Sequence, residues 1–193
     1  MRGLGLVLGL VCLVGAAGHA EGKNAILFIG DGMGVAQTTA ARIYAANARD
    51  GKLTLDTFEH IALVRTYSAN TMVTDSAAAG TALGTGHKTN TLMVGQLPDG
   101  TPLDSILRRA KSAGMSVGIV TTTTVSHGTP SSFYAHADNR FIQPPLVDQL
   151  VAYGEIDVIL GGGRKYFVPR GTEDPETGEP SGRRDDENRM DEI

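Results

Sequence analysis

The chain has 193 residues, a formal net charge of −4 and no tryptophan. The acidic balance and the lack of a basic stripe exclude nucleic acid as the main partner. After the N-terminus, no segment reaches the roughly 18 uninterrupted apolar residues of a membrane span. The length is sufficient for one domain with one hydrophobic core.

Residues 1–20 have the pattern of a secretory signal peptide. Arg2 supplies the positive start, residues 4–14 are the apolar part, and residues 18–20 form a small-x-small cleavage site. The only cysteine, Cys12, lies inside this segment and lacks the small preceding residue of a lipidation box. We therefore expect an exported protein, periplasmic or extracellular, whose mature part contains no disulfide.

Strands and helices are predicted to alternate along the mature chain. The expected strands are 25–29, 64–68, 117–124 and 156–160; the expected helices are about 35–48, from 76 onward, 102–114 and 146–153. This alternation is typical of an α/β fold with a mainly parallel sheet and helices on both faces. Ligands bind beyond the carboxyl ends of such strands, so we expect Asp31, Ser76 and His127 to share one edge.

Residues 169–193 have a different composition from the rest of the chain. They are dense in Glu, Asp, Arg, Pro and Gly and contain few apolar side chains. The segment is predicted to be a surface loop or a disordered tail, with a charged interaction tail as the alternative.

The segment Asp75-Ser76 opens a run of small residues that predicts a tightly packed helix start. The backbone N–H groups and the helix dipole at such a start favour an anion, so Ser76 is placed to hold a phosphate or to act on one. The alternative is an ordinary N-cap followed by helix-forming residues.

Asp31 lies in a glycine-lined turn after the first expected strand, where it either caps the following helix or binds a cation. Two nucleotide-binding motifs are excluded here. A dinucleotide fingerprint needs a small residue at position 35, which is valine, and a phosphate loop over 84–89 would need glycine where His87 stands.

Three further residues have both a structural and a functional interpretation. Thr129 is a turn hydroxyl or a cation ligand, and His127 is a packed side chain or a ligand. Arg140 is a solvated charge or a bidentate clamp on a phosphate.

Four motifs together resemble the alkaline phosphatase family in order and spacing. They are residues 24–34, 73–82, 127–140 and 159–167, and the resemblance spans about 23–170. It implies an α/β fold and hydrolysis of phosphate monoesters through a phosphoserine intermediate. It also implies a site with two zinc ions and one magnesium ion.

The resemblance implies a role for each candidate residue. Ser76 matches the nucleophile, and Arg140 matches the arginine that binds the phosphate oxygens. Asp31 matches the carboxylate shared by a zinc and the magnesium, and Thr129 matches a magnesium ligand. His127 matches a position beside the magnesium site that is aspartate in some members and histidine in others.

Members of the family are more than twice as long as this chain, and most of their zinc ligands lie in the remaining part. We therefore expect residues 21–193 to be the N-terminal part of an alkaline phosphatase domain, incomplete at the C-terminus and inactive alone. A homodimer is implied for the full-length protein. The alternatives are an exported phosphate-binding module without catalysis, or another metal-dependent phosphohydrolase or sulfohydrolase of the same fold.

Overall fold

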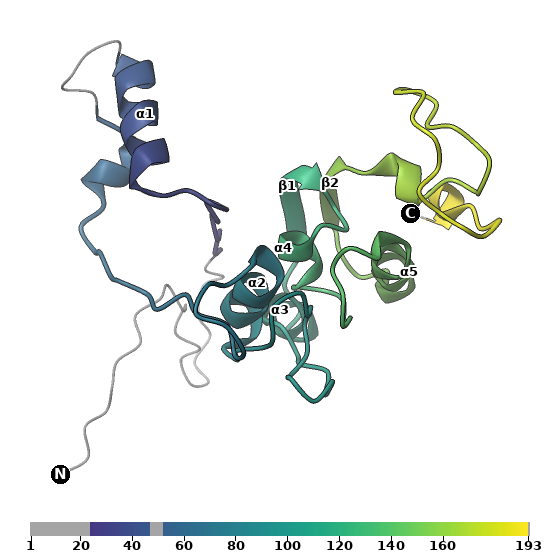
Figure 1. The fold of residues 1–193 in the computed structure, drawn as a ribbon, viewed down its shortest axis with the longest axis horizontal. Helices are drawn as coiled ribbons and strands as arrows, with labels where there is room; N and C mark the ends of the chain where they lie inside the picture. Colours follow the sequence, from purple (N-terminus) through teal and green to yellow (C-terminus); the bar gives the residue numbers. More distant parts are fainter. Residues whose placement is uncertain (1–23, 47–51, 193) are drawn as a thin grey trace. The chain divides into compact units, whose positions relative to one another are not determined.

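The computed structural model describes residues 24–46 and 52–192, which belong to two compact units (Figure 1). The first unit extends to Arg65 and the second begins at Thr66. The predicted signal peptide, residues 1–20, lies outside the described residues. No helix in the described part is long and apolar enough to cross a membrane.

The first unit contains the helix α1 (Val35–Ala46) and the 3-10 helix η1 (Thr54–Thr57). The helix predicted after Gly34 is thus confirmed up to the end of the described segment. Arg42 on α1 donates from Nε to Asp56 Oδ2 at 2.8 Å, and the Leu53 N–H donates to the same oxygen at 2.9 Å. This ion pair connects α1 to η1.

The strands predicted at 25–29 and 64–68 are wrong. Both segments are irregular, and Phe28 is 88% and Val64 68% exposed. A strand is stable only where a neighbouring strand completes its backbone hydrogen bonds. Among the described residues, the only sheet pairs two other segments, so these apolar runs have no partner strand.

The sheet of the second unit consists of β1 (Gly118–Thr124) and β2 (Val158–Gly162), paired in parallel as predicted. Ile119 pairs with Ile159, and after a register shift Thr124 pairs with Gly162. The β-branched residues of β1 explain its strand conformation. Between the two strands the chain forms two helices, as a parallel connection requires.

The described part of the second unit has four α-helices. Two precede β1 in the sequence, α2 (Ser76–Thr85) and α3 (Ile106–Ser112), and two lie between β1 and β2, α4 (Gly128–Ser131) and α5 (Gln143–Tyr153). The helix predicted at 102–114 begins later than expected. Ser105 caps α3 by accepting from the Arg108 N–H at 3.2 Å, whereas Pro102 pairs with Gln96 in an isolated bridge. A serine N-cap fixes the helix start more strongly than a preceding proline.

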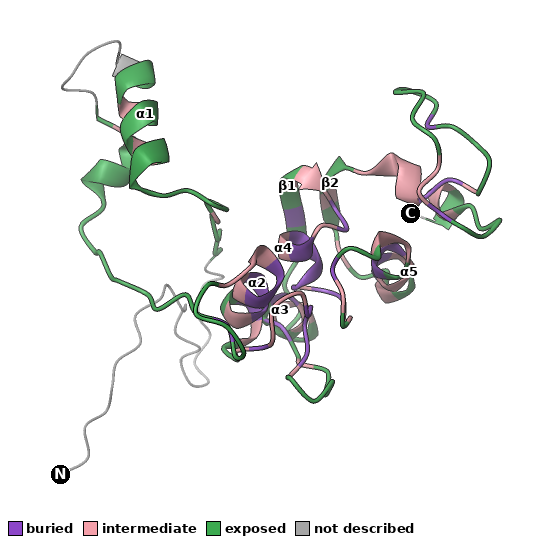
Figure 2. Ribbon diagram, in the orientation of Figure 1, coloured by how far each residue is buried: buried purple, intermediate pink, exposed green. Residues whose placement is uncertain are grey.

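The core of the second unit is formed by side chains from α2, α3, β1 and α5 and from the loops between them. Buried residues gather on α2 and α4, whereas Ile119 is the buried residue of β1 (Figure 2). The core side chains include Ala77, Val94, Ile119, Val125, Tyr134, Leu146 and Val147. The Tyr134 hydroxyl donates to the Val125 carbonyl at 2.8 Å, so this buried phenol is satisfied and fixes the end of β1.

Beyond β2, the chain forms the 3-10 helix η2 (Arg164–Tyr166), a mostly exposed loop and the 3-10 helix η3 (Arg189–Glu192). Arg183 connects this loop to α5: its side chain is 1% exposed and Nη1 donates to Asp148 Oδ1 at 2.9 Å. Arg183 also pairs with Asp185 at 2.6 Å, and Arg189 binds Asp148 at 3.0 Å.

Candidate active site

Ser76 is the first residue of α2, which confirms the predicted helix start. The preceding residue, Asp75, is the N-cap in an extended conformation, and its Oδ1 accepts the Ala78 N–H at 3.1 Å. The Asp75 carbonyl accepts the Ala79 N–H at 3.1 Å, so Asp75 binds the first turn through both its side chain and its backbone. The positive end of the helix dipole lies at Ser76, and an anion is favoured there.

Asp75 also forms an ion pair with Arg140, which follows it by 65 positions in the sequence. Arg140 Nη1 donates to Asp75 Oδ2 at 3.0 Å, and the Arg140 side chain is 7% exposed. Burial alone would raise the pKa of Asp75. The hydrogen bonds from Ala78, Arg140 and Leu92 outweigh it, so the pKa lies below its usual value and the carboxylate stays charged.

The guanidinium of Arg140 reaches His127, the residue that precedes α4. Arg140 Nη2 lies 3.1 Å from both ring nitrogens of His127. It also lies against the backbone of Gly128, because a Cβ at that position would be 2.7 Å from Nε. Arg140 Nε is buried and has no hydrogen-bond partner among the described residues.

Direct contact between α2 and α4 holds Ser76 and Thr129 in the same part of the unit. Ser132, at the end of α4, lies 2.6 Å from the Gly128 carbonyl and 3.1 Å from the Ala77 carbonyl through its hydroxyl. A Cβ at Gly80 would be 2.9 Å from that hydroxyl and 3.3 Å from the Thr129 carbonyl. Glycine at position 80 therefore permits the close approach of the two helices.

The second unit thus brings together four of the predicted site residues: Ser76, His127, Thr129 and Arg140. The fifth, Asp31, belongs to the first unit, in an exposed turn where the Met33 N–H donates to the Gly30 carbonyl at 3.2 Å. That turn follows the segment predicted to be a strand, which is irregular.

The described residues do not by themselves fit a complete zinc centre. Zinc in proteins takes three or four nitrogen, sulfur or carboxylate ligands. Within the described residues, no group of three His, Cys, Asp or Glu side chains converges as a metal site. His127 and Thr129 lie in the second unit, whereas Asp31 lies in the first.

The sequence-based prediction gave no role to three residues that shape this site: Gly128, Ser132 and Leu92. Gly128 directly precedes Thr129 and Ser132 follows it by three positions, and small residues at such spacing are a signal for close helix approach. Leu92 contacts both Asp75 and Arg140 through its backbone, and nothing in the identity of a leucine indicates this.

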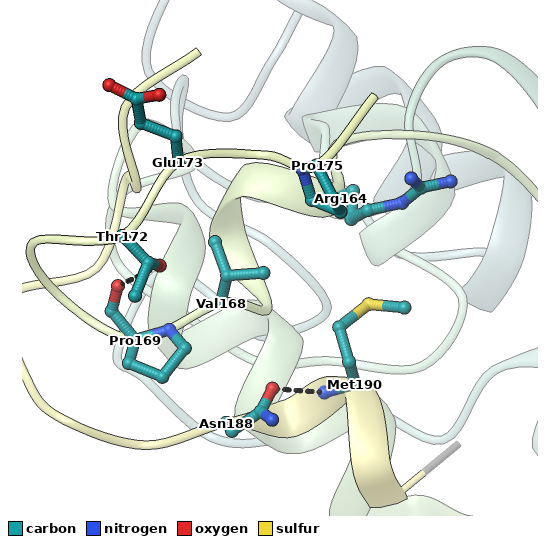
Figure 3. A pocket seen from close by; sticks show the side chains of 8 residues that line it. All are labelled: Arg164, Val168, Pro169, Thr172, Glu173, Pro175, Asn188 and Met190. Atoms are coloured by element: carbon teal, nitrogen blue, oxygen red, sulfur yellow. Dashed lines mark hydrogen bonds between the residues drawn. The ribbon is translucent and has the colours of Figure 1, made fainter. Parts of the chain in front are cut away.

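A separate hollow of about 390 Å³ lies in the C-terminal part of the second unit (Figure 3). Its lining includes Arg164, Val168, Glu173 and Met190 and none of the predicted site residues. The Asn188 side chain accepts the Met190 N–H at 3.3 Å, so this hollow is bounded by the η3 segment rather than by α2 or α4.

A family model described as alkaline phosphatase matches residues 22–193. The chain belongs to the alkaline phosphatase family. It is 42% identical over 199 residues to an alkaline phosphatase of Gadus morhua, covering 86% of this chain and 42% of the relative. It is also 42% identical to the human tissue-nonspecific isozyme, covering 80% of this chain and 35% of that protein. The chain therefore spans about two fifths of the curated relatives' length.

Solved alkaline phosphatases have the same fold. A cold-active enzyme from Shewanella sp. matches with a TM-score of 0.66 and 37% identity, covering 72% of this chain and 36% of that structure. A mutant of TAB5 alkaline phosphatase with Mg bound in its M3 site matches with a TM-score of 0.65 and 33% identity, covering 71% and 38%. The α/β fold predicted from the sequence is confirmed.

Proposed function

We propose that the protein to which this chain belongs hydrolyses phosphate monoesters, with Ser76 as nucleophile and Arg140 as phosphate ligand. The observation that carries this proposal is the buried, incompletely paired guanidinium beside the N-terminus of the Ser76 helix. A buried donor without a partner is costly, and an anion that accepts from Arg140 Nε would remove that cost. Family membership supports the same class of reaction.

The proposed reaction depends on neutralising the negative charge of the phosphate group. Phosphoryl transfer requires mainly positioning and neutralisation of the phosphate oxygens. The first turn of α2 and Arg140 would neutralise these oxygens, and Asp75 would hold Arg140 in place. Ser76 Oγ forms a bond to phosphorus while the ester P–O bond breaks. Water then hydrolyses the phosphoserine, releases inorganic phosphate and restores the hydroxyl.

We propose two zinc ions and one magnesium ion as cofactors, with Asp31, Thr129 and His127 among the residues around them. Metal ions at such a site lower the pKa of a bound hydroxyl or water and neutralise phosphate charge. The solved TAB5 mutant with Mg bound in its M3 site supports metal ions as cofactors. Because the described residues do not form a complete centre, we expect the 193-residue chain alone to bind zinc weakly and to turn over phosphate esters negligibly.

The decisive test is covalent trapping of radiolabelled phosphate on the intact protein at acidic pH. We expect labelled phosphoserine in the wild type and none in Ser76→Ala. Label that persists in Ser76→Ala would contradict the assignment of the nucleophile. Ser126→Ala is the matched control, because Ser126 is a buried serine of the same unit whose hydroxyl donates to Gln143.

A chelator distinguishes the enzyme from a phosphate-binding module without catalysis. If EDTA abolishes both phosphate binding and hydrolysis and added zinc and magnesium restore them, the enzyme is supported. Phosphate binding that survives EDTA without hydrolysis would favour the binding module.

Export and dimerisation complete the proposal. The signal peptide predicted at residues 1–20 supports a periplasmic or extracellular location, which N-terminal sequencing of the secreted protein would test by a start at Glu21. The expected homodimer of the full-length protein is tested by analytical ultracentrifugation.

A further inference from the structure

Leu92 has an unusual backbone conformation for its residue type. Its φ is 75°, and it is the only residue other than glycine with positive φ in the described part of the chain. It is the third residue of a turn closed by the Met93 N–H to the Asn90 carbonyl at 3.1 Å. Type II turns have glycine or asparagine at this position because a Cβ is crowded there.

Both polar groups of Leu92 bind residues of the candidate active site. The Leu92 N–H donates to Asp75 Oδ1 at 3.2 Å. The Leu92 carbonyl accepts the Arg140 N–H at 3.0 Å. One residue therefore contacts the carboxylate that caps the Ser76 helix and the backbone of the arginine that pairs with that carboxylate.

The segment around Leu92 is held by hydrogen bonds on both sides, so the neighbouring residues enforce its strained conformation. On one side, the Thr91 N–H donates to Asn70 Oδ1 at 2.9 Å. On the other, Val94 pairs with Ala137 through two backbone bonds of 2.8 and 3.0 Å. Strained backbone persists only where its surroundings enforce it, and such residues cluster at functional sites.

We propose that Leu92 is a positioning residue for the phosphate site. Its left-handed conformation directs the N–H to Asp75 and the carbonyl to Arg140, and so fixes the Arg140 guanidinium relative to the start of the Ser76 helix. A negative φ at position 92 would turn these two groups away from their partners. This inference rests on the proposed function, but the placement of Arg140 can be tested without it.

The test compares Leu92→Gly with Leu92→Val. Glycine adopts positive φ freely, whereas a β-branched residue strongly disfavours it. The readouts are the ¹⁵N–¹H signal of Arg140 Nε and the dissociation constant for inorganic phosphate. We expect Leu92→Gly to preserve both and Leu92→Val to shift the signal and to weaken phosphate binding about tenfold. Leu83→Val is the matched control, because Leu83 lies on α2 and is half exposed.

A second variant removes the contact without changing the side chain. Replacing Leu92 by leucic acid through nonsense suppression turns the amide between Thr91 and Leu92 into an ester. The ester lacks the N–H that binds Asp75 but keeps the Leu92 side chain and carbonyl, and we expect the same signal shift and weaker phosphate binding. The inference is overturned if both this ester and a folded Leu92→Val keep the wild-type Arg140 signal. If the wild type itself binds no phosphate, the proposed function fails, while the Arg140 signal still decides the role of Leu92.

Discussion

The guanidinium of Arg140 lies flat enough against Gly128 that a Cβ at position 128 would be 2.6 Å from its Cζ. Arg140 and Gly128 are 12 positions apart. Gly128 is the first residue of α4, and the preceding residue, His127, also contacts the Arg140 guanidinium. Side chains larger than hydrogen at position 128 are therefore incompatible with the observed place of Arg140.

We expect Gly128→Ala to lower the free energy of unfolding by about 1–3 kcal/mol, because the added methyl overlaps the guanidinium. In an Arg140→Ala background the same change should cost less than half as much, since the overlapping group is absent. Urea denaturation of the four proteins measures this coupling. Equal costs in both backgrounds would show that the methyl clashes with something else.

Asp75 has two separable roles, and two substitutions distinguish them. Asp75→Asn keeps an N-cap acceptor for Ala78 but loses the charge opposite Arg140, which should cost about 1–2 kcal/mol. Asp75→Ala loses both and should cost about 1 kcal/mol more. Denaturant midpoints provide the comparison. If the two variants were equally stable, the capping contribution would be negligible.

The contact between α1 and η1 depends on pH through Asp56. The hydrogen bond from Arg42, followed by that from the Leu53 N–H, lowers the pKa of Asp56 from 3.8 to about 2. A depressed pKa favours the charged form in the folded state, so the contribution to stability is present above pH 4 and is lost as the pH falls towards 2. A ¹³C NMR titration of the Asp56 carboxyl should give this midpoint. In Arg42→Ala the midpoint should rise towards 3.8; an unchanged midpoint would contradict the assignment to Arg42.

The loop between η2 and η3 should open when Arg183 is removed. Arg183→Ala deletes the bonds to Asp148 and Asp185, whose side chains are partly exposed, so we expect about 1.4 kcal/mol less local stability. A Glu-specific protease should then cleave after Glu173 and Glu176 about tenfold faster. Arg170→Ala is the control, since its pair with Asp186 is exposed and should contribute little. Equal acceleration in both variants would contradict this role.

Local signals in the sequence predicted part of this fold and site well. The Asp75-Ser76 helix start depends on a cap and a run of small residues, and β1 depends on β-branched residues, both of which are local properties. The strand expected at 25–29 is wrong because a strand also requires a partner, which local sequence does not encode. The pairing of Asp75 with Arg140 across 65 positions requires the folded chain.

The conformation of Leu92 could not be predicted from the sequence. A glycine at position 92 would have indicated positive φ, but a leucine indicates the opposite. Similarly, Gly80 and Gly128 are visible as small residues, yet only the contact between α2 and α4 shows which neighbour each one accommodates.

The double role of Asp75 makes the first turn of α2 a natural reporter of the anion site. An anion that draws Arg140 away from Asp75 would leave the carboxylate bound only by backbone N–H groups. The hydrogen bonds from these N–H groups to Asp75 would then become stronger. The Ala78 amide accordingly registers events at Arg140 without any added probe, although the two residues are distant in sequence.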